Sequence, residues 1–268
     1  MIHADVAPHV RSLLVSDVHL GSHRCQARAL HDLLTATKPE TLLLVGDTID
    51  LWSVRAGMRW PATHTAILLR LCELLARGTR VVLLPGNHDE TLLELPELSL
   101  PGMEMRRDFV LETRMGGRFL VVHGHEQDVM FGATHAVARV AYGVTEHLSS
   151  LTRVVSGSIR LPLLARRRTA HRQTRLHRTV RRSARFELAV TREARRRGLD
   201  GVICGHTHAP ADREIAGIRY LNCGDWIKSC TAVVETSAGE LQLVRWPPGT
   251  RAGIHHTGRA ASDGARAP

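Results

Sequence analysis

The sequence has few aromatic residues and few cysteines. Phe, Trp and Tyr together make up 4% of the 268 residues, so the chain offers few of the side chains on which single-stranded nucleic acids stack. Its five cysteines are odd in number and form no Cys-x-x-Cys pair, which argues against a disulfide scaffold or a zinc ribbon. This cysteine usage is typical of a protein from the reducing cytoplasm.

Long apolar runs are also missing. Uncharged apolar stretches such as 41–46 and 81–86 are far shorter than the roughly 20 residues that span a bilayer. The first residues, with Asp5 and Pro8 ahead of Arg11, lack the apolar core of a signal peptide. We therefore expect a cytoplasmic protein without a transmembrane helix.

Lysine is nearly absent, and the arginines are concentrated in one segment. The net charge of the chain is +10, yet residues 151–200 alone contain 15 arginines against three acidic residues. Such a segment suits a polyanion, whether nucleic acid, phospholipid headgroups or a phosphorylated substrate. The alternative is that 34 arginines against two lysines reflect codon bias, and that the segment is only a solvated helix face.

Short apolar runs that end in polar clusters recur along the chain. The runs expected to form strands are 13–15, 42–45, 81–84, 120–122 and 202–204, and helical spacing is found at about 25–36 and 63–77. This alternation predicts an α/β sandwich. Three later runs, 218–221, 231–234 and 241–244, are expected to complete a second sheet, with a hairpin turn at 237–239.

Residues 127–197 interrupt this rhythm. They are helical in composition and rich in arginine, which predicts an inserted helical hairpin or lid within a domain of residues 1–246. Residues 247–268 are rich in Gly, Ala, Pro and Arg and have no apolar periodicity. They are expected to form a disordered tail.

Imidazole, carboxylate and amide side chains follow five of the expected strands. They are Asp17, His19, Asp47, Asp50, Asn87, His88, Asp89, His123, His125, His206 and His208. Any one of them could be an ordinary polar pair or a helix N-cap, but a packed domain has little structural reason to gather so many. Metal ions would stabilise such a set. Nitrogen and oxygen ligands without thiolate suit Mn²⁺, Fe or Zn²⁺ at a catalytic centre, and the set is too large for one ion.

Five motifs, in order, resemble those of the calcineurin-like metallophosphoesterases. They are Asp17-Val18-His19, Gly46-Asp47-Thr48-Ile49-Asp50, Gly86-Asn87-His88-Asp89, His123-Gly124 and Gly205-His206-Thr207-His208. The resemblance extends over about residues 11–246 and implies that family's β-sandwich flanked by helices. The segments 16–21, 222–226 and 229–231, together with Trp52, look like the UDP-2,3-diacylglucosamine pyrophosphatase branch and its uncharacterised relatives. Phosphoprotein phosphatases instead carry arginine after the equivalent of Asp50, where this chain has Leu51.

The resemblance also implies roles for these residues. Asp17, His19, Asp47 and His208 would hold one divalent ion, most simply Mn²⁺, and Asp47, Asn87, His123 and His206 would hold a second. The shared Asp47 would bridge them, because a carboxylate can link ions roughly 3.5 to 4 Å apart that together acidify a water. His88 would donate a hydrogen bond to a phosphoryl or leaving oxygen, and Asp50 would orient it.

His125 departs from the closer branch, which usually carries aspartate at this position. We expect His125 to contact the substrate, and the alternative is that it is an extra metal ligand. In the insertion, Arg167, Arg168, Arg181 and Arg182 belong to an arginine stripe that is expected to meet anionic headgroups or a phosphorylated, lipid-linked substrate.

The closer branch implies a peripheral enzyme at the inner face of the cytoplasmic membrane. Its reaction would be cleavage of the pyrophosphate in a lipid-linked UDP-sugar of the lipid A pathway. The alternative is a phosphodiesterase or nuclease of the same family whose arginines contact a phosphate backbone, although the low aromatic content disfavours nucleic acid. A non-enzymatic scaffold would be expected to have lost metal ligands, and none is missing. No protein partner is predicted.

Overall fold

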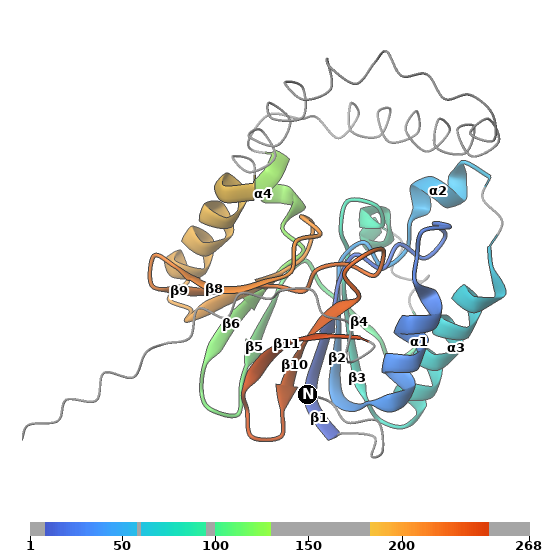
Figure 1. Cartoon of the computed structure of the whole chain (residues 1–268), viewed down its shortest axis with the longest axis horizontal. Coiled ribbons are helices and arrows are strands. Elements are labelled where there is room, and N and C mark those ends of the chain that lie inside the picture. Colours follow the sequence, from blue (N-terminus) through green and yellow to red (C-terminus); the bar gives the residue numbers. More distant parts are fainter. Residues whose placement is uncertain (1–8, 58–59, 95–99, 130–182, 247–268) are drawn as a thin grey trace, which may run out of the picture.

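Two β-sheets pack face to face and carry helices on their outer sides (Figure 1). The computed structural model describes residues 9–57, 60–94, 100–129 and 183–246. Within these ranges the architecture is the α/β sandwich flanked by helices that the sequence predicts.

The first sheet has six strands in the order β11-β10-β1-β2-β3-β4. Their bounds are β1 (His9–Val15), β2 (Lys38–Val45), β3 (Arg80–Leu84), β4 (Glu104–Met105), β10 (Thr231–Thr236) and β11 (Leu241–Arg245). Strands β1 to β4 pair in parallel, whereas β10 pairs antiparallel with β1 and with β11. The carboxyl ends of β1, β2 and β3 therefore lie at one end of the sheet.

The second sheet has five strands in the order β5-β6-β7-β9-β8. Their bounds are β5 (Phe109–Glu112), β6 (Arg118–Val121), β7 (Gly201–Cys204), β8 (Ala211–Ile215) and β9 (Ile218–Asn222). The prediction that all three late runs complete this sheet is wrong for two of them. Only β9 joins it, because β10 pairs with β1 and so extends the first sheet together with β11.

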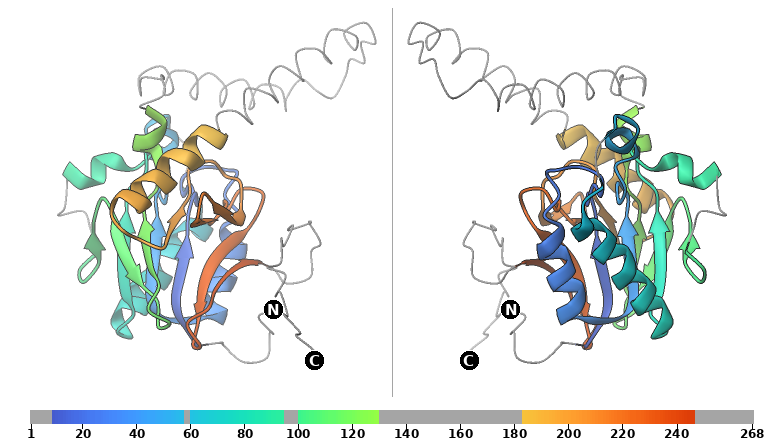
Figure 2. Two further views of the ribbon diagram at one scale, coloured as in Figure 1. Left: turned by 90° about the vertical axis from the view of Figure 1, so that its left-hand side faces the viewer. Right: turned by 90° about the vertical axis from the view of Figure 1, so that its right-hand side faces the viewer.

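Helices cover the outer faces of both sheets (Figure 2). α1 (Ala27–Ala36) and α3 (Ala62–Ala76) pack on the first sheet, within two residues of their predicted bounds. A helix over residues 183–196 packs on the second sheet. Three short helical turns follow strand ends, namely α2 (Leu51–Arg55), η1 (Glu90–Glu94) and α4 (His125–Val129).

Side chains that alternate along the inner strands build the core on both faces of the first sheet. Leu14 of β1 packs between the sheets with Leu43, Val121 and Ile203. Its neighbour Leu13 points to the layer of α1 and α3, because successive side chains of a strand face opposite ways. Burial on both faces explains why these strands are continuous apolar runs in the sequence.

The carboxyl-terminal part of the predicted insertion belongs to the sandwich. In the helix over 183–196, Phe186, Val190 and Ala194 are buried against the second sheet. Their spacing of four residues places them on one helix face. The predicted range of 127–197 is therefore too long at its carboxyl end. Residues 130–182, with the four arginines of the predicted stripe, and the expected tail at 247–268 lie outside the described residues.

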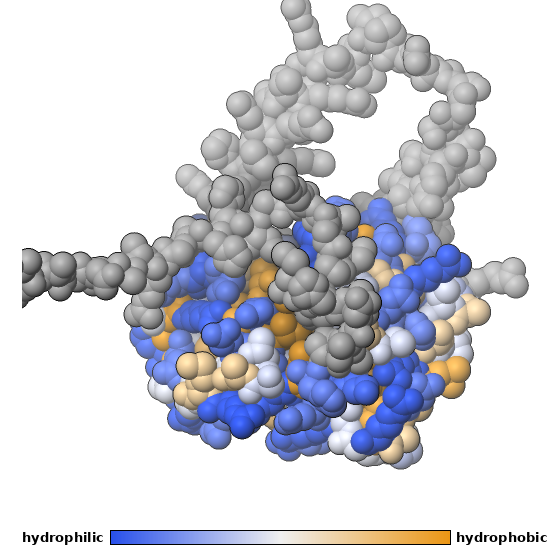
Figure 3. All heavy atoms as spheres, turned by 60° about the horizontal axis from the view of Figure 1, so that its bottom comes forward, coloured by the Kyte–Doolittle hydropathy of each residue, from blue (hydrophilic) through white to orange (hydrophobic). Residues whose placement is uncertain are grey.

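The described surface at the end remote from the polar clusters is mostly hydrophilic, with hydrophobic residues in small groups (Figure 3). Within the described ranges, none of the helices combines the length and the apolar character that spanning a bilayer requires.

Candidate metal centre

Polar side chains from both sheets meet where the parallel strands end. The first sheet contributes the residues that follow β1, β2 and β3. The second sheet contributes the residues that follow β6 and β7. Three groups of side chains have ligand atoms that all lie within 4.8 Å of one another. These groups are Asp17-His19-His208, His19-Asp47-His88 and Asp17-Asp47-His123.

Asp47 lies at the centre of this cluster. Its Oδ2 atom is 3.5 Å from His123 Nε2 and 3.7 Å from His19 Nε2. Asp17 Oδ1 is 3.2 Å from His208 Nε2 and 3.9 Å from His19 Nε2. Ligand atoms that share an ion at about 2.0 to 2.2 Å are separated by roughly 3 to 4 Å. The side chains are therefore spaced to hold metal ions.

The imidazoles form two pairs. The rings of His19 and His208 stack with centroids 5.3 Å apart, and the rings of His123 and His206 are also 5.3 Å apart. These are the two histidine pairs expected for the two ions. Asn87 lines the same cavity as His19, His206 and His208. Asp17 and His123 share a group of ligand atoms with Asp47, so the structure brings all seven predicted ligands together.

Several buried ligand atoms have no hydrogen-bond partner among the described residues. They are Asp17 Oδ1, His19 Nε2, Asn87 Oδ1 and His123 Nε2. Buried polar atoms are rarely left in this state, and two buried carboxylates need a compensating positive charge. The chemistry of the donor set thus fits divalent ions, and it points to a dimetal site.

Hydrogen bonds behind the ligands fix their orientation. His123 Nδ1 lies 3.0 Å from the carbonyl oxygen of Val45 and must donate to it, so Nε2, which faces Asp47, is the ring nitrogen that could ligate an ion. Asp17 Oδ2 accepts hydrogen bonds from Ser16 Oγ at 2.7 Å and from the amide of His206 at 2.9 Å. The carboxylate Oδ1 then faces His208.

Glycine is required at two positions that border the cluster. A Cβ atom on Gly46 would overlap the His123 ring, and one on Gly86 would overlap the Asp47 carboxylate. The motif glycines therefore allow the strand ends to approach closely enough for their side chains to share ions.

The expected contact between Asp50 and His88 is present. Asp50 Oδ1 lies 2.9 Å from His88 Nδ1, while the same carboxylate caps α2 through the amide and hydroxyl of Ser53. Burial alone would lower the pKa of His88, but the hydrogen bond to Asp50 and the charges of Asp47 and Asp50 outweigh it and raise the pKa. The Trp52 ring stacks on His88 at a centroid distance of 3.9 Å.

Asp225 is a site residue to which the sequence analysis assigns no role. Its Oδ2 atom lies 3.1 Å from His208 Nδ1, and its Oδ1 atom accepts backbone hydrogen bonds from Ile227, Lys228 and Ser229. Burial raises its pKa, but the hydrogen bonds from His208 and the backbone lower it more, so the net pKa is below the ordinary value. Its only sequence signal is its place in the 222–226 segment shared with the closer branch.

Asp89 ties two strand ends together. Its carboxylate accepts hydrogen bonds from the amides of Gly86 at 2.6 Å and Thr48 at 2.8 Å. The loops after β2 and β3, which carry Asp47 and Asn87, are thereby held against each other.

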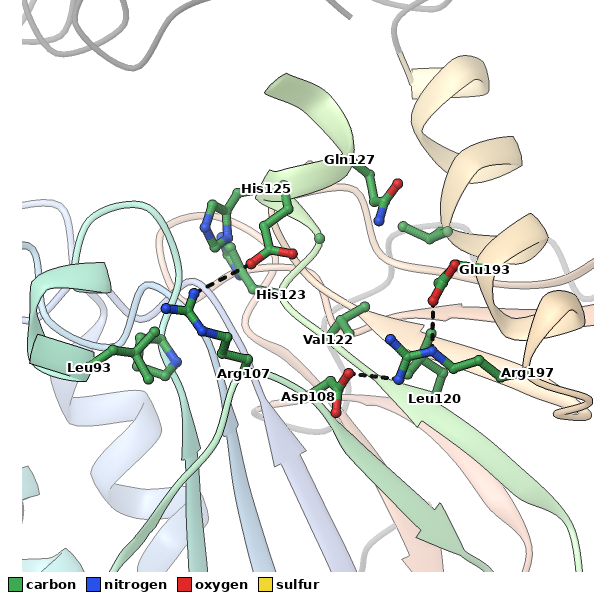
Figure 4. Close-up of a pocket in the computed structure, with 14 residues that line it drawn as sticks. Leu93, Arg107, Asp108, Leu120, Val122, His123, His125, Gln127, Glu193 and Arg197 are labelled. Carbon is green, nitrogen blue, oxygen red and sulfur yellow. Dashed lines mark hydrogen bonds and ion pairs between the residues drawn. The ribbon is translucent and has the colours of Figure 1, made fainter. Parts of the chain in front are cut away.

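His125 lies beside the cluster and faces a different space (Figure 4). It lines a cavity of about 60 Å³ together with Arg107 and Glu126, and its Nε2 atom is 3.7 Å from Glu90 Oε1. Its ring is 5.5 Å from that of His123. Among the described residues, none of the groups that could hold an ion includes His125, and its contact with substrate stays a prediction.

A larger cavity of about 350 Å³ opens over the metal centre. Its lining residues are His19, Arg24, Asp47, Asn87, His88, His206, His208, Asp225, Ile227 and Lys228. This cavity gives a substrate access to the ligands and to His88.

The fold and the site together define a metal-dependent phosphoesterase. Residues 10–210 match the family described as calcineurin-like phosphoesterase, and the chain belongs to that family. It is 32% identical over 229 residues to the UDP-2,3-diacylglucosamine hydrolase of Azotobacter vinelandii, covering 80% of this chain and 90% of the relative. It is 28% identical over 246 residues to the protein of the same name from Aeromonas salmonicida, covering 87% of this chain and 92% of the relative.

Among solved structures, the phosphoesterase Yfce from E. coli superposes with a TM-score of 0.43 at 15% identity. The match covers 87% of this chain and 97% of that one.

Proposed function

We propose that this protein hydrolyses the pyrophosphate of a lipid-linked UDP-sugar of the UDP-2,3-diacylglucosamine type, at the inner face of the cytoplasmic membrane. The observation that carries the proposal is the similarity to hydrolases of that name over most of both chains. The complete set of ligand side chains at one site supports it. Mn²⁺ is the proposed metal, because the donors are nitrogen and oxygen without thiolate.

Two divalent ions at this site would acidify a water molecule and offset charge on the phosphoryl oxygens. The side chains of the protein arrange the rest of the reaction. Asp47 lies between the two histidine pairs and is placed to contact both ions. Its other oxygen, Oδ1, accepts a hydrogen bond from the amide of His88 at 2.8 Å, which prevents rotation of the carboxylate.

His88 is the proposed proton donor to a phosphoryl or leaving oxygen. Its Nδ1 is bonded to Asp50, so in the doubly protonated ring only Nε2 can serve the substrate. Nε2 is 3.9 Å from Asp47 Oδ2 and borders the cavity. Stacking on Trp52 and the bond to Asp50 hold the ring in this orientation.

A substrate panel tests the proposal. The purified protein is given Mn²⁺ and, in parallel, UDP-2,3-diacylglucosamine in mixed micelles, a UDP-sugar without acyl chains, a cyclic nucleotide and a short DNA. We expect the highest kcat/KM for the lipid-linked substrate, with two monophosphate products. A higher kcat/KM for DNA or the cyclic nucleotide would overturn the proposal in favour of a phosphodiesterase or nuclease.

A further inference from the structure

We propose that Arg24 and Lys228 form a subsite for the second phosphate of a pyrophosphate substrate, next to the phosphate that reaches the metal centre. This inference rests on the proposed function, because only a substrate with two adjacent phosphates would use both places at once. The two cations would distinguish a pyrophosphate from a simple phosphodiester at this site.

Both cations border the cavity that contains the metal ligands. Arg24 lies between β1 and α1, and Lys228 lies between β9 and β10. Both residues are exposed, so a ligand that enters the cavity can reach them. Lys228 forms no ion pair with any residue in the part of the chain that the structure describes.

The two loops are connected to each other on one side of the centre. The amide of Trp226 donates a hydrogen bond to the carbonyl oxygen of Asp17 at 3.1 Å. The amide of Gln26 donates a hydrogen bond to the carbonyl oxygen of Trp226 at 2.7 Å. The loop of Lys228 leads into β10, and the loop of Arg24 follows β1. These two strands are paired neighbours. Arg24 and Lys228 therefore belong to the same side of the cavity.

His88 and Asn87 belong to the opposite side. They follow β3, and β2, which leads to Asp47, lies between β3 and β1. In the strand order of the first sheet, the loop that carries His88 is thus followed by the loop of Asp47 and then by the loop that carries Arg24. A phosphate at the centre would have His88 on one side and the positive charges on the other.

The loops that carry the two cations are anchored on the ligand residues themselves. The amide of Lys228 donates to Asp225 Oδ1 at 2.8 Å, and the other oxygen of Asp225 contacts His208. The amide of Arg24 donates to Ser22 Oγ at 3.3 Å, and the amide of Ser22 donates to the carbonyl oxygen of His19 at 2.9 Å. Anchoring of this kind reduces the ordering needed when an anion binds.

The two side chains have complementary chemistry for phosphate. A guanidinium can donate two parallel hydrogen bonds to phosphate oxygens, whereas an ammonium acts as a compact point charge. At neutral pH both phosphates of a pyrophosphate diester carry a negative charge, while a simple diester carries one. The second charge is what this pair would neutralise.

The test compares an Arg24→Gln/Lys228→Gln variant with a Lys38→Gln/Arg77→Gln control. The control removes the same charge from exposed residues at the other end of the molecule, where β2 and β3 begin. Each protein is assayed with a UDP-sugar and with bis(p-nitrophenyl) phosphate, and its Mn²⁺ content is measured. We expect kcat/KM of the cavity variant to fall at least about tenfold more for the UDP-sugar than for the diester. The control should match the parent on both.

A binding arm separates failure of this subsite from failure of the proposed function. Calorimetry in Mn²⁺ buffer measures the affinity for α,β-methylene-UDP, which has two phosphates, and for UMP, which has one. A parent that does not hydrolyse UDP-2,3-diacylglucosamine would refute the proposed function. The subsite would still stand if the cavity variant lost at least about tenfold more affinity for the diphosphate than for UMP. Equal losses of affinity for both ligands, or no loss for either, would overturn the subsite.

Discussion

Five of the predicted metal ligands have a backbone conformation that is unfavourable for residues other than glycine. Their φ angles are 52° at Asp17, 54° at His19, 50° at Asp47, 68° at His206 and 55° at His208. Each such residue costs about 1 to 3 kcal/mol. Backbone hydrogen bonds between strand ends hold two of them. The Asp17 amide donates to the carbonyl oxygen of Gly46 at 3.0 Å, and the His19 amide donates to the backbone carbonyl oxygen of Asp47 at 2.8 Å. The fold thus stores strain at the residues that turn their side chains into the site.

Replacing Asp47 by asparagine should remove metal and activity together. Asparagine tolerates the positive φ of this residue, but it lacks the charge of the central carboxylate. We expect the Asp47→Asn variant to lose at least one ion per chain by elemental analysis, with phosphoesterase activity lowered at least about 100-fold. The exposed Asp32→Asn variant on α1 is the control. Full metal content with full activity would exclude a bridging role.

His88→Ala should separate proton donation from metal binding. We expect unchanged metal content and a kcat lowered by a factor of about 10² to 10⁴, the usual range for an acid or base. The half-exposed His31→Ala variant on α1 should behave like the parent. Loss of an ion from His88→Ala would make this residue a ligand, as its membership of the His19-Asp47-His88 group allows.

Asp225→Asn should weaken metal binding through His208. The amide group of asparagine would favour a His208 ring that accepts at Nδ1 and carries its proton on Nε2, where it cannot ligate a metal. We expect calorimetry to show Mn²⁺ affinity lowered by about 10- to 100-fold, with Asp32→Asn again as the control. Unchanged affinity would show that Asp225 stabilises only its own loop.

At the scale of elements, the helix over 183–196 is part of the site's support. The ring of Phe186 lies 5.6 Å from that of His206, and a Cβ atom on Gly124 would overlap Phe186. The helix therefore packs directly behind the loops after β6 and β7, which carry His123 and His206.

Phe186→Ala should destabilise the fold much more than a truncation on the exposed side of the same helix. Phe186 is 1% exposed and Leu188 is 41% exposed. Truncating a buried phenylalanine costs about 3 to 5 kcal/mol, so we expect a loss of that size in the free energy of urea-induced unfolding. Leu188→Ala should cost less than about 1 kcal/mol. Similar losses for both variants would contradict the packing of this helix.

At the scale of the whole molecule, positive charge and catalytic groups are separated along the chain. The metal ligands come from loops of the sandwich, whereas most of the arginines of the 151–200 segment lie outside the described residues. Attraction between arginines and an anionic surface is screened over roughly 8 Å at physiological salt. We expect any membrane contact through this segment to be sensitive to salt.

Replacing Arg167, Arg168, Arg181 and Arg182 by glutamine should weaken membrane binding. Each arginine near an anionic surface contributes about 1 kcal/mol, so sedimentation with phosphatidylserine vesicles should fall and the KM for a membrane-embedded substrate should rise. Hydrolysis of a small soluble diester should change much less.

A control with equal charge change replaces Arg28, Lys38, Arg55 and Arg77, which are exposed residues of the sandwich. It should bind vesicles as the parent does. Unchanged vesicle binding by the insertion variant, with lost affinity for DNA, would favour the nuclease alternative.

The sequence alone determined the local features of this protein. Short stretches of sequence predict the apolar runs of β1, β2 and β3, the bounds of α1 and α3, and the polar clusters at strand ends. They can do so because burial and strand or helix periodicity act over a few residues. The five ordered motifs marked the seven side chains that the structure brings together.

Tertiary structure decided the long-range pairings. No local pattern shows that β10 pairs with β1, which ends 216 residues earlier in the chain, or that Asp225 reaches His208 across 17 residues. The sequence assigned Phe186 to an insertion, yet it packs behind the metal site. Such contacts depend on which distant elements bury each other's apolar faces and polar groups, and that is settled only when the whole core is assembled.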